Sequence, residues 1–146
     1  MFTAGQYAAN AYAKIGIETG LEAADPHRLI LMLFEGALLA TVDAKRHMLS
    51  GNLAGKGESI SKAIMIINDG LRASLDLNVG GALAHNLRAL YSYMSQRLLI
   101  ASAQKDAAMI DEVHKLLGEL RDAWATIQPG TAANPVSARE PDRRQA

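Results

Sequence analysis

Cysteine is absent from the 146 residues of this chain, which excludes a disulfide scaffold and any metal site built from thiolates. An excess of charge is absent as well, because 15 basic and 15 acidic residues cancel. A chain without net charge has no general electrostatic attraction to nucleic acid or to anionic membranes. Neither is therefore an expected partner.

Long apolar runs are missing too. The longest, at residues 29–34, is too short to span a bilayer. Residues 1–13 have neither the basic segment nor the continuous apolar stretch of a secretory signal peptide. We therefore expect no membrane insertion and no secretory signal.

Metal-binding patterns suited to a helical protein are incomplete. A di-iron bundle needs a Glu on each of two helices and Glu-x-x-His on each of two others. The nearest approach is one Asp111-x-x-His114 pair, and Asp43 shares a helical face with His47 one turn away. The ligand count fails, so we expect no metal and no other cofactor. We expect all four histidines to face solvent: His27, His47, His85 and His114.

Signatures of catalysis are also absent. The sequence contains no Gly-x-Ser-x-Gly nucleophile elbow, no phosphate-binding loop and no dinucleotide fingerprint. Glu35 is the only acid within the most apolar stretch of the chain, and a catalytic role would require a raised pKa. The simpler interpretation is that Glu35 faces solvent or a backbone N–H group, so we do not expect an enzyme.

Apolar residues recur at steps of three and four in four successive segments, which is the periodicity of an α-helix. The expected helices cover residues 26–50, about 56–76, about 82–102 and about 106–127. Asp25 followed by Pro26 is a helix start signal, and Gln128-Pro129-Gly130 ends the last helix. Four helices with short connections predict an all-α, antiparallel, up-down four-helix bundle.

The second expected helix has one clear apolar stripe. Met65 and Ile66 fall outside this stripe, which indicates a second apolar patch on the same helix. The stripe consists of Ile60, Ile64, Ile67, Leu71 and Leu75.

The two ends of the chain differ from its centre. Residues 1–24 are rich in small residues with scattered apolar side chains, and we expect an arm that is extended or contains a short helix. Residues 129–146 mix Pro, Ala, Asn and Arg without apolar periodicity, which is typical of a disordered tail. The bundle domain is expected to cover residues 25–128.

Several short motifs occur in a distinctive order and spacing. Near the N-terminus they are Ala-Tyr-Ala at 11–13 and Ile-Glu at 17–18, and the first expected helix contributes the run at 24–37. The second expected helix contributes Lys-Gly at 56–57 and the residues at 61–64, 66–67 and 70–71. The turn and the third expected helix contribute Gly-Gly at 80–81, Asn-Leu at 86–87, and the residues at 90–91, 93–94 and 97–99. Over residues 10–128 this pattern resembles the FliS family of flagellar secretion chaperones. The chain departs from the family pattern at Asp25 (commonly Ser), Phe34 (often Tyr) and His85 (frequently an acid).

The resemblance implies a cytoplasmic, non-enzymatic chaperone. Its partner would be the disordered C-terminal segment of flagellin, which folds into helices in an apolar groove of the bundle. This contact would prevent premature polymerisation and keep flagellin competent for export. The family also leads us to expect a contact with the flagellar export gate. The alternative is a helical adaptor that uses the same groove for another flagellar export or regulatory protein.

The groove is expected on an exposed shoulder of the second and third helices, because a four-helix core needs only one face of each helix. For each position, the competing interpretation is ordinary core packing. The candidate residues are Ile60, Ile64, Ile67, Leu71, Leu87, Leu90, Tyr91 and Met94.

The N-terminal arm carries apolar residues on a segment too short to form its own core: Tyr12, Ile15 and Ile17. The resemblance implies that such an arm can cover the groove in the free chaperone and move when flagellin arrives. The alternatives are an arm fixed by structural packing and an arm that contacts flagellin directly.

Overall fold

A computed structural model describes residues 25–127 of the chain. This part forms four α-helices and one π-helical segment: α2 (Pro26–Ser50), α3 (Leu53–Met65), η2 (Ile66–Arg72), α4 (Gly81–Gln104) and α5 (Ala107–Thr126). The predicted all-α fold is confirmed, and the helix bounds lie within a few residues of those expected. The arm at 1–24 and the tail at 129–146 lie outside the described residues.

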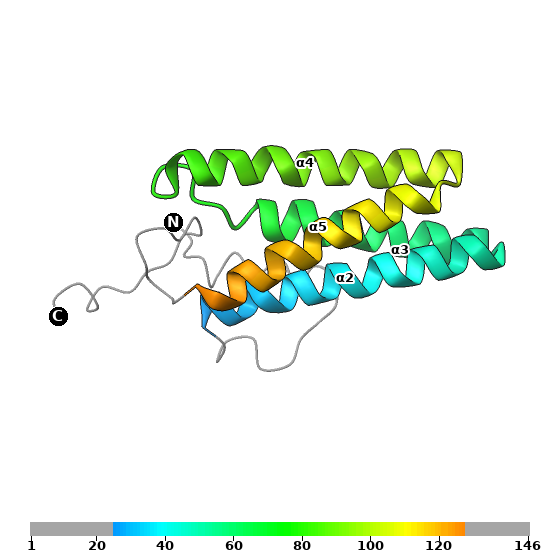
Figure 1. Ribbon diagram of the computed structural model, residues 1–146, viewed down its shortest axis with the longest axis horizontal. Helices are drawn as coiled ribbons and strands as arrows, with labels where there is room; N and C mark the ends of the chain where they lie inside the picture. Colours follow the sequence, from blue (N-terminus) through cyan, green and yellow to red (C-terminus); the bar gives the residue numbers. More distant parts are fainter. Residues whose placement is uncertain (1–24, 128–146) are drawn as a thin grey trace, which may run out of the picture.

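The helices form a bundle in which α2 is the central element. It contacts both α3 and α5, while α4 lies against α5, α3 and η2. Figure 1 shows α5 crossing between α4, at the top of the view, and α2. Alanines on α2 and α3, among them Ala37, Ala40 and Ala63, are buried, so the backbones of these helices can approach closely.

Local sequence signals set the helix ends. The Asp25 side chain accepts a hydrogen bond from Arg28 N at 2.7 Å, and Pro26 occupies the first turn, as the sequence predicts. Asn52 caps α3 by accepting from Gly55 N at 2.9 Å. Gly51 ends α2 in the left-handed conformation at φ 77°, where a side chain would be strained.

The expected second helix changes its winding halfway. From Ile66 to Arg72 the chain is π-helical, so the i→i+5 pattern widens the turn and shifts the buried face. Ile66 and Ile67 are both buried, and so are Gly70 and Leu71. Ile66 is part of the core with Ala63 and Ile67, so the prediction that it belongs to a separate apolar patch is wrong.

The core is apolar and draws on every helical element. Its largest fully buried side chains are Leu29, Leu33, Ile66, Ile67, Leu71, Met94, Leu98, Ile110, Leu117 and Val113. Within residues 25–127, no helix has both the length and the apolarity needed to cross a membrane.

Candidate docking surface

Five of the eight predicted groove residues are core residues. The expectation that they form an exposed shoulder is wrong, because α4 packs against η2 and α3 and encloses them. Their role in binding a partner stays a prediction. The five are Ile60, Ile67, Leu71, Tyr91 and Met94.

The other three predicted residues, Ile64, Leu87 and Leu90, are half-buried and reach the edge of the core. They are the part of the predicted set that a partner could contact without opening the bundle. The arm residues Tyr12, Ile15 and Ile17 lie outside the described residues.

One side-chain hydrogen bond sets the register of the helices that meet at the seam between α3 and α4. The Ser95 hydroxyl donates to Asn68 Oδ1 at 3.0 Å and fixes the register of this seam. Ile64 lies one turn before Asn68, and Leu99 lies one turn after Ser95. Because the two helices run antiparallel, Ile64 and Leu99 stand at the same level of the seam.

A buried lysine fixes the same seam at the start of α3 and the end of α4. Lys56 is buried on α3, and its ammonium group donates to the backbone oxygen of Ser102 at 3.0 Å. Ser102 lies in the last turn of α4, where backbone oxygens lack helical partners and the helix dipole favours a positive charge. Two polar contacts, Ser95 with Asn68 and Lys56 with Ser102, therefore hold α4 in register against α3 and η2.

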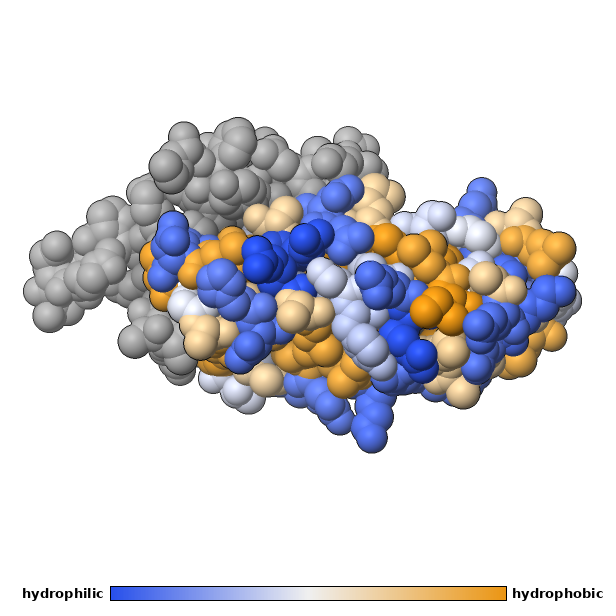
Figure 2. Space-filling model, turned by 90° about the horizontal axis from the view of Figure 1, so that it is seen from above, coloured by the Kyte–Doolittle hydropathy of each residue, from blue (hydrophilic) through white to orange (hydrophobic). Residues whose placement is uncertain are grey.

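α4 exposes more large apolar side chains than a core-facing helix requires. Leu83, Tyr93, Leu99 and Ile100 are 43%, 42%, 59% and 39% exposed, respectively. Figure 2 views the molecule from the α4 side and shows apolar patches between hydrophilic side chains on this face. We call these four residues together with Ile64, Leu87 and Leu90 the α4 surface. Leu99, Tyr93 and Ile100 were not among the predicted docking residues. The signal that could have revealed them is the spread of apolar residues around most of the circumference of α4.

An apolar cavity of about 180 Å³ lies beneath one end of this surface. Three predicted groove residues, Leu71, Leu87 and Tyr91, line it. Burial raises the pKa of the Tyr91 hydroxyl well above its ordinary range. The remaining lining residues are Ile30, Phe34, Leu75, Leu83, Leu120, Ala123, Trp124 and Ile127.

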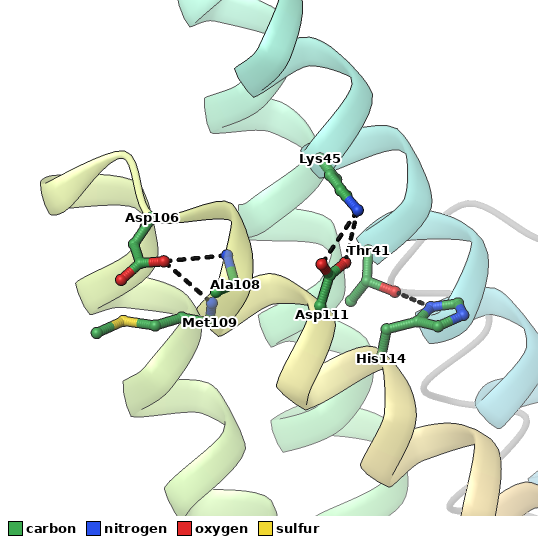
Figure 3. A network of polar contacts seen from close by, with 7 residues as sticks. All are labelled: Thr41, Lys45, Asp106, Ala108, Met109, Asp111 and His114. Atoms are coloured by element: carbon green, nitrogen blue, oxygen red, sulfur yellow. Dashed lines mark hydrogen bonds and ion pairs between the residues drawn. The ribbon is translucent and has the colours of Figure 1, made fainter.

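A shallower groove of about 690 Å³ lies between α2 and the first half of α5. Polar pairs cross it, as Figure 3 shows. Lys45 Nζ lies 3.0 Å from Asp111 Oδ1, and Thr41 Oγ1 lies 2.9 Å from His114 Nδ1. The Thr41 hydroxyl donates its one proton to Leu38 O at 2.7 Å, so it accepts from His114.

The expectation of solvent-facing histidines is therefore wrong for His114, and it is wrong for His27 as well. His27 Nε2 lies 2.7 Å from the backbone oxygen of Trp124, and both histidines join α2 to α5. They occupy polar positions of amphipathic helices, which is why the sequence pattern did not reveal the partners. His85 is exposed, as expected.

The described residues offer no constellation for metal or acid–base chemistry. Within residues 25–127 there is no group of three or more His, Cys, Asp or Glu side chains that could hold a metal ion. Glu35 is 51% exposed and lies 3.7 Å from Arg121 NH1, which confirms the expected solvent-facing carboxylate. What the fold provides is apolar surface on a helical scaffold, and this defines a protein-binding module.

Comparison with known proteins identifies the kind of module. The family described as flagellar protein FliS matches residues 8–131, and the chain belongs to this family. Its members include the flagellar secretion chaperone FliS of Salmonella typhimurium, which is 47% identical over 119 residues, covering 82% of this chain and 88% of the relative. The Escherichia coli chaperone is 44% identical over 128 residues, which cover 86% of this chain and 94% of the relative. The Bacillus subtilis chaperone is 32% identical over 107 residues, which cover 73% of this chain and 78% of the relative. The chain is thus a chaperone of flagellar export and not an enzyme.

Proposed function

We propose that this chaperone binds the disordered C-terminal segment of flagellin in the cytoplasm, prevents its premature polymerisation and keeps it competent for export. The observation that carries the proposal is the α4 surface. The bundle core is complete without Leu83, Tyr93, Leu99 and Ile100, yet all four remain exposed on one helix. Figure 2 shows apolar patches on the face that carries α4, and exposed apolar patches are typical of protein interaction sites.

The α3–α4 seam suits an amphipathic helix. Ile64 and Leu99 flank the seam, and a helix laid along it would place its own apolar stripe between them. Tyr93 lies on the other flank of α4, where its hydroxyl donates to Glu112 of α5, and its aromatic ring offers apolar surface there. A segment that folds as it binds must offset its ordering cost, so we expect the contact to extend along most of α4.

Calorimetric titration of the full chain with the flagellin C-terminal segment tests the proposal. We expect saturable one-to-one binding, a gain of helix by circular dichroism and a negative heat-capacity change. Absence of binding to a folded, helical chain would contradict the proposal. In that case, titration with other flagellar export proteins would test the alternative of a helical adaptor with another client.

A matched pair of variants tests the location. Leu99→Glu places a charge beside the seam, and we expect about tenfold weaker binding of the flagellin segment. Leu49→Glu makes the same change on α2, at a site that is 69% exposed and outside the α4 surface. We expect that variant to bind like the parent chain. Equal weakening in both variants would mean that the α4 surface is not the docking site.

The N-terminal arm is included in the proposal as a cap over the docking surface. If Tyr12, Ile15 and Ile17 cover the surface in the free chaperone, deleting residues 1–17 should tighten binding or leave it unchanged. A large loss of affinity with the fold intact would make these residues direct contacts and would refute the cap. A contact with the flagellar export gate belongs to the same proposal, and pull-down of the gate by the loaded chaperone checks it.

A further inference from the structure

A stripe along α2 has the spacing of a coiled-coil seam and reaches solvent. Its six positions follow one another at steps of four and three residues, which is the heptad pattern. Val42 and Leu49 are 48% and 69% exposed and line the shallow groove between α2 and α5, while Leu31 and Leu38 are half-buried. We call this set the α2 stripe. It consists of Leu31, Glu35, Leu38, Val42, Lys45 and Leu49.

The α2 stripe is complementary to itself in the antiparallel direction. Two copies paired about the level of Ala40 place Leu31 opposite Leu49 and Leu38 opposite Val42. The same register places Glu35 of each copy opposite Lys45 of the other. Every position therefore meets an apolar or an oppositely charged partner, which is what a two-fold interface between identical chains requires.

Other ways of pairing the α2 stripe with itself are unfavourable. A parallel arrangement places Glu35 opposite Glu35 and Lys45 opposite Lys45, so like charges meet at two levels. An antiparallel arrangement shifted by one heptad places Glu35 opposite Leu38 or Lys45 opposite Val42. The sequence of α2 therefore favours one direction and one register.

Charges on α5 extend the complementarity. Lys45 Nζ lies 3.0 Å from Asp111 Oδ1, and Glu35 Oε2 lies 3.7 Å from Arg121 NH1. The side chains of Glu35 and Lys45 are still 51% and 40% exposed, and an ammonium group has three protons to donate, so both can also pair with a second copy. Across the interface the signs would alternate, from Asp111 and Lys45 of one copy to Glu35 and Arg121 of the other.

We propose that the α2 stripe binds a second copy of this chain, antiparallel, with the two-fold axis at the level of Ala40. Leu39 is 62% exposed and lies beside this axis, where it would meet Leu39 of the second copy. One pair of helices about 27 Å long forms a small interface, so we expect a reversible dimer with a Kd of about 10–100 µM. Figure 1 shows α2 and α4 at opposite edges of the bundle, so the dimer would leave the α4 surface free.

Sedimentation equilibrium of the full chain, from about tenfold below to about tenfold above this Kd, should show a monomer–dimer equilibrium. Glu35→Lys and Lys45→Glu should each weaken association at least about tenfold, because each places like charges opposite one another twice. An equimolar mixture of the two variants should associate to within about threefold of the parent chain, because the mixed dimer has opposite charges at both contacts. A parent chain that stays monomeric, or a mixture that associates no better than either variant alone, would overturn the proposal.

Cross-linking tests the direction of the two helices. The sequence lacks cysteine, so one cysteine can be introduced at a time. Leu39→Cys places its thiol beside the proposed axis, whereas Leu49→Cys places it about 27 Å from its copy. A short bismaleimide should therefore link the Leu39→Cys chain at least about tenfold faster. Equal rates, or a faster reaction of the Leu49→Cys chain, would overturn the antiparallel register.

Two variants separate this dimer from flagellin binding. Leu49→Glu should weaken self-association at least about tenfold, because it places a carboxylate opposite Leu31, and Leu99→Glu should leave self-association unchanged. The flagellin segment should respond to these two variants in the opposite way, so either proposal can fail without the other. Loss of self-association in Leu99→Glu but not in Leu49→Glu would place the dimer on the α4 surface and overturn the proposal.

Discussion

His27 and Trp124 hold each other by two reciprocal hydrogen bonds. The Trp124 indole N–H donates to His27 O at 2.9 Å, and His27 Nε2–H donates to Trp124 O at 2.7 Å. Their rings are stacked, with centroids 4.8 Å apart. Because His27 lies in the first turn of α2 and Trp124 in the last turn of α5, this pair joins the two helix ends that border the cavity.

Breaking this pair should destabilise the bundle. We expect Trp124→Phe to lower the free energy of unfolding by about 2 kcal/mol, through one lost hydrogen bond and a smaller ring. His27→Ala should cost about 1 kcal/mol, and the double variant should show a coupling of at least about 0.5 kcal/mol. Urea unfolding followed by circular dichroism measures all three. His85→Ala, at an exposed histidine of α4, is the control and should change stability by less than about 0.5 kcal/mol. Additive losses in the double variant of His27 and Trp124 would contradict a coupled pair.

Much of the fold could be predicted because local signals agree with the periodicity. Asp25 and Pro26 mark the start of α2, and the observed cap bond to Arg28 N is the one that an aspartate at this position makes. The apolar steps of three and four determined the number and approximate length of the helices. The core positions of a bundle follow from these steps, because each helix must bury its apolar stripe.

The docking surface was harder to predict, because periodicity does not show how deeply a stripe is covered. Met94 and Leu99 are both apolar residues of α4, yet one is fully buried and the other exposed. The difference depends on where η2 and α3 lie against α4, which the sequence of α4 alone does not contain. The π-helical segment is a similar case, because the sequence periodicity predicts a regular helix and the wide turn has no local signal in the sequence.

Two adjacent isoleucines at the start of the π-helical segment should contribute equally to the free energy of unfolding. Ile66→Ala and Ile67→Ala should each lower the free energy of unfolding by about 3 kcal/mol, because both side chains are fully buried. Met65→Ala should cost less, since Met65 is half-buried. Chemical denaturation of the three variants makes the comparison. A loss for Ile66→Ala no greater than that for Met65→Ala would mean that Ile66 is not a core residue in solution.

Two glycines of α3 should respond oppositely to alanine. A Cβ at Gly55 would lie 2.7 Å from His47 Cγ and 2.7 Å from His47 Nδ1, whereas a Cβ at Gly57 would meet nothing within 4 Å. Gly57→Ala should therefore stabilise by up to about 1 kcal/mol through helix propensity, and Gly55→Ala should destabilise. Thermal unfolding measures both. The same Cβ would lie 2.8 Å from Asn52 Nδ2, so adding His47→Ala to Gly55→Ala should remove the contacts with the imidazole and recover part of the stability. No recovery would show that Asn52 is the main obstacle.

Glu112 should carry a pH dependence that Tyr93 controls. The Tyr93 hydroxyl donates to the Glu112 carboxylate, and Arg97 Nε donates to it at 2.9 Å. These contacts, the Tyr93 bond first, hold the pKa of Glu112 below its ordinary value. A carboxyl group with a lowered folded-state pKa contributes stability above its unfolded pKa, and this contribution is lost as pH falls through the folded-state pKa.

Tyr93→Phe should therefore raise the pKa of Glu112 toward its ordinary value, and the variant should lose less stability than the parent chain between neutral pH and about pH 3. NMR titration of the Glu112 side-chain carbon measures the pKa directly, and urea unfolding at both pH values measures the stability. Arg97→Gln is the companion variant, because it keeps the Tyr93 bond and removes the charge. An unchanged pKa in Tyr93→Phe together with a raised pKa in Arg97→Gln would show that the guanidinium alone controls this carboxylate.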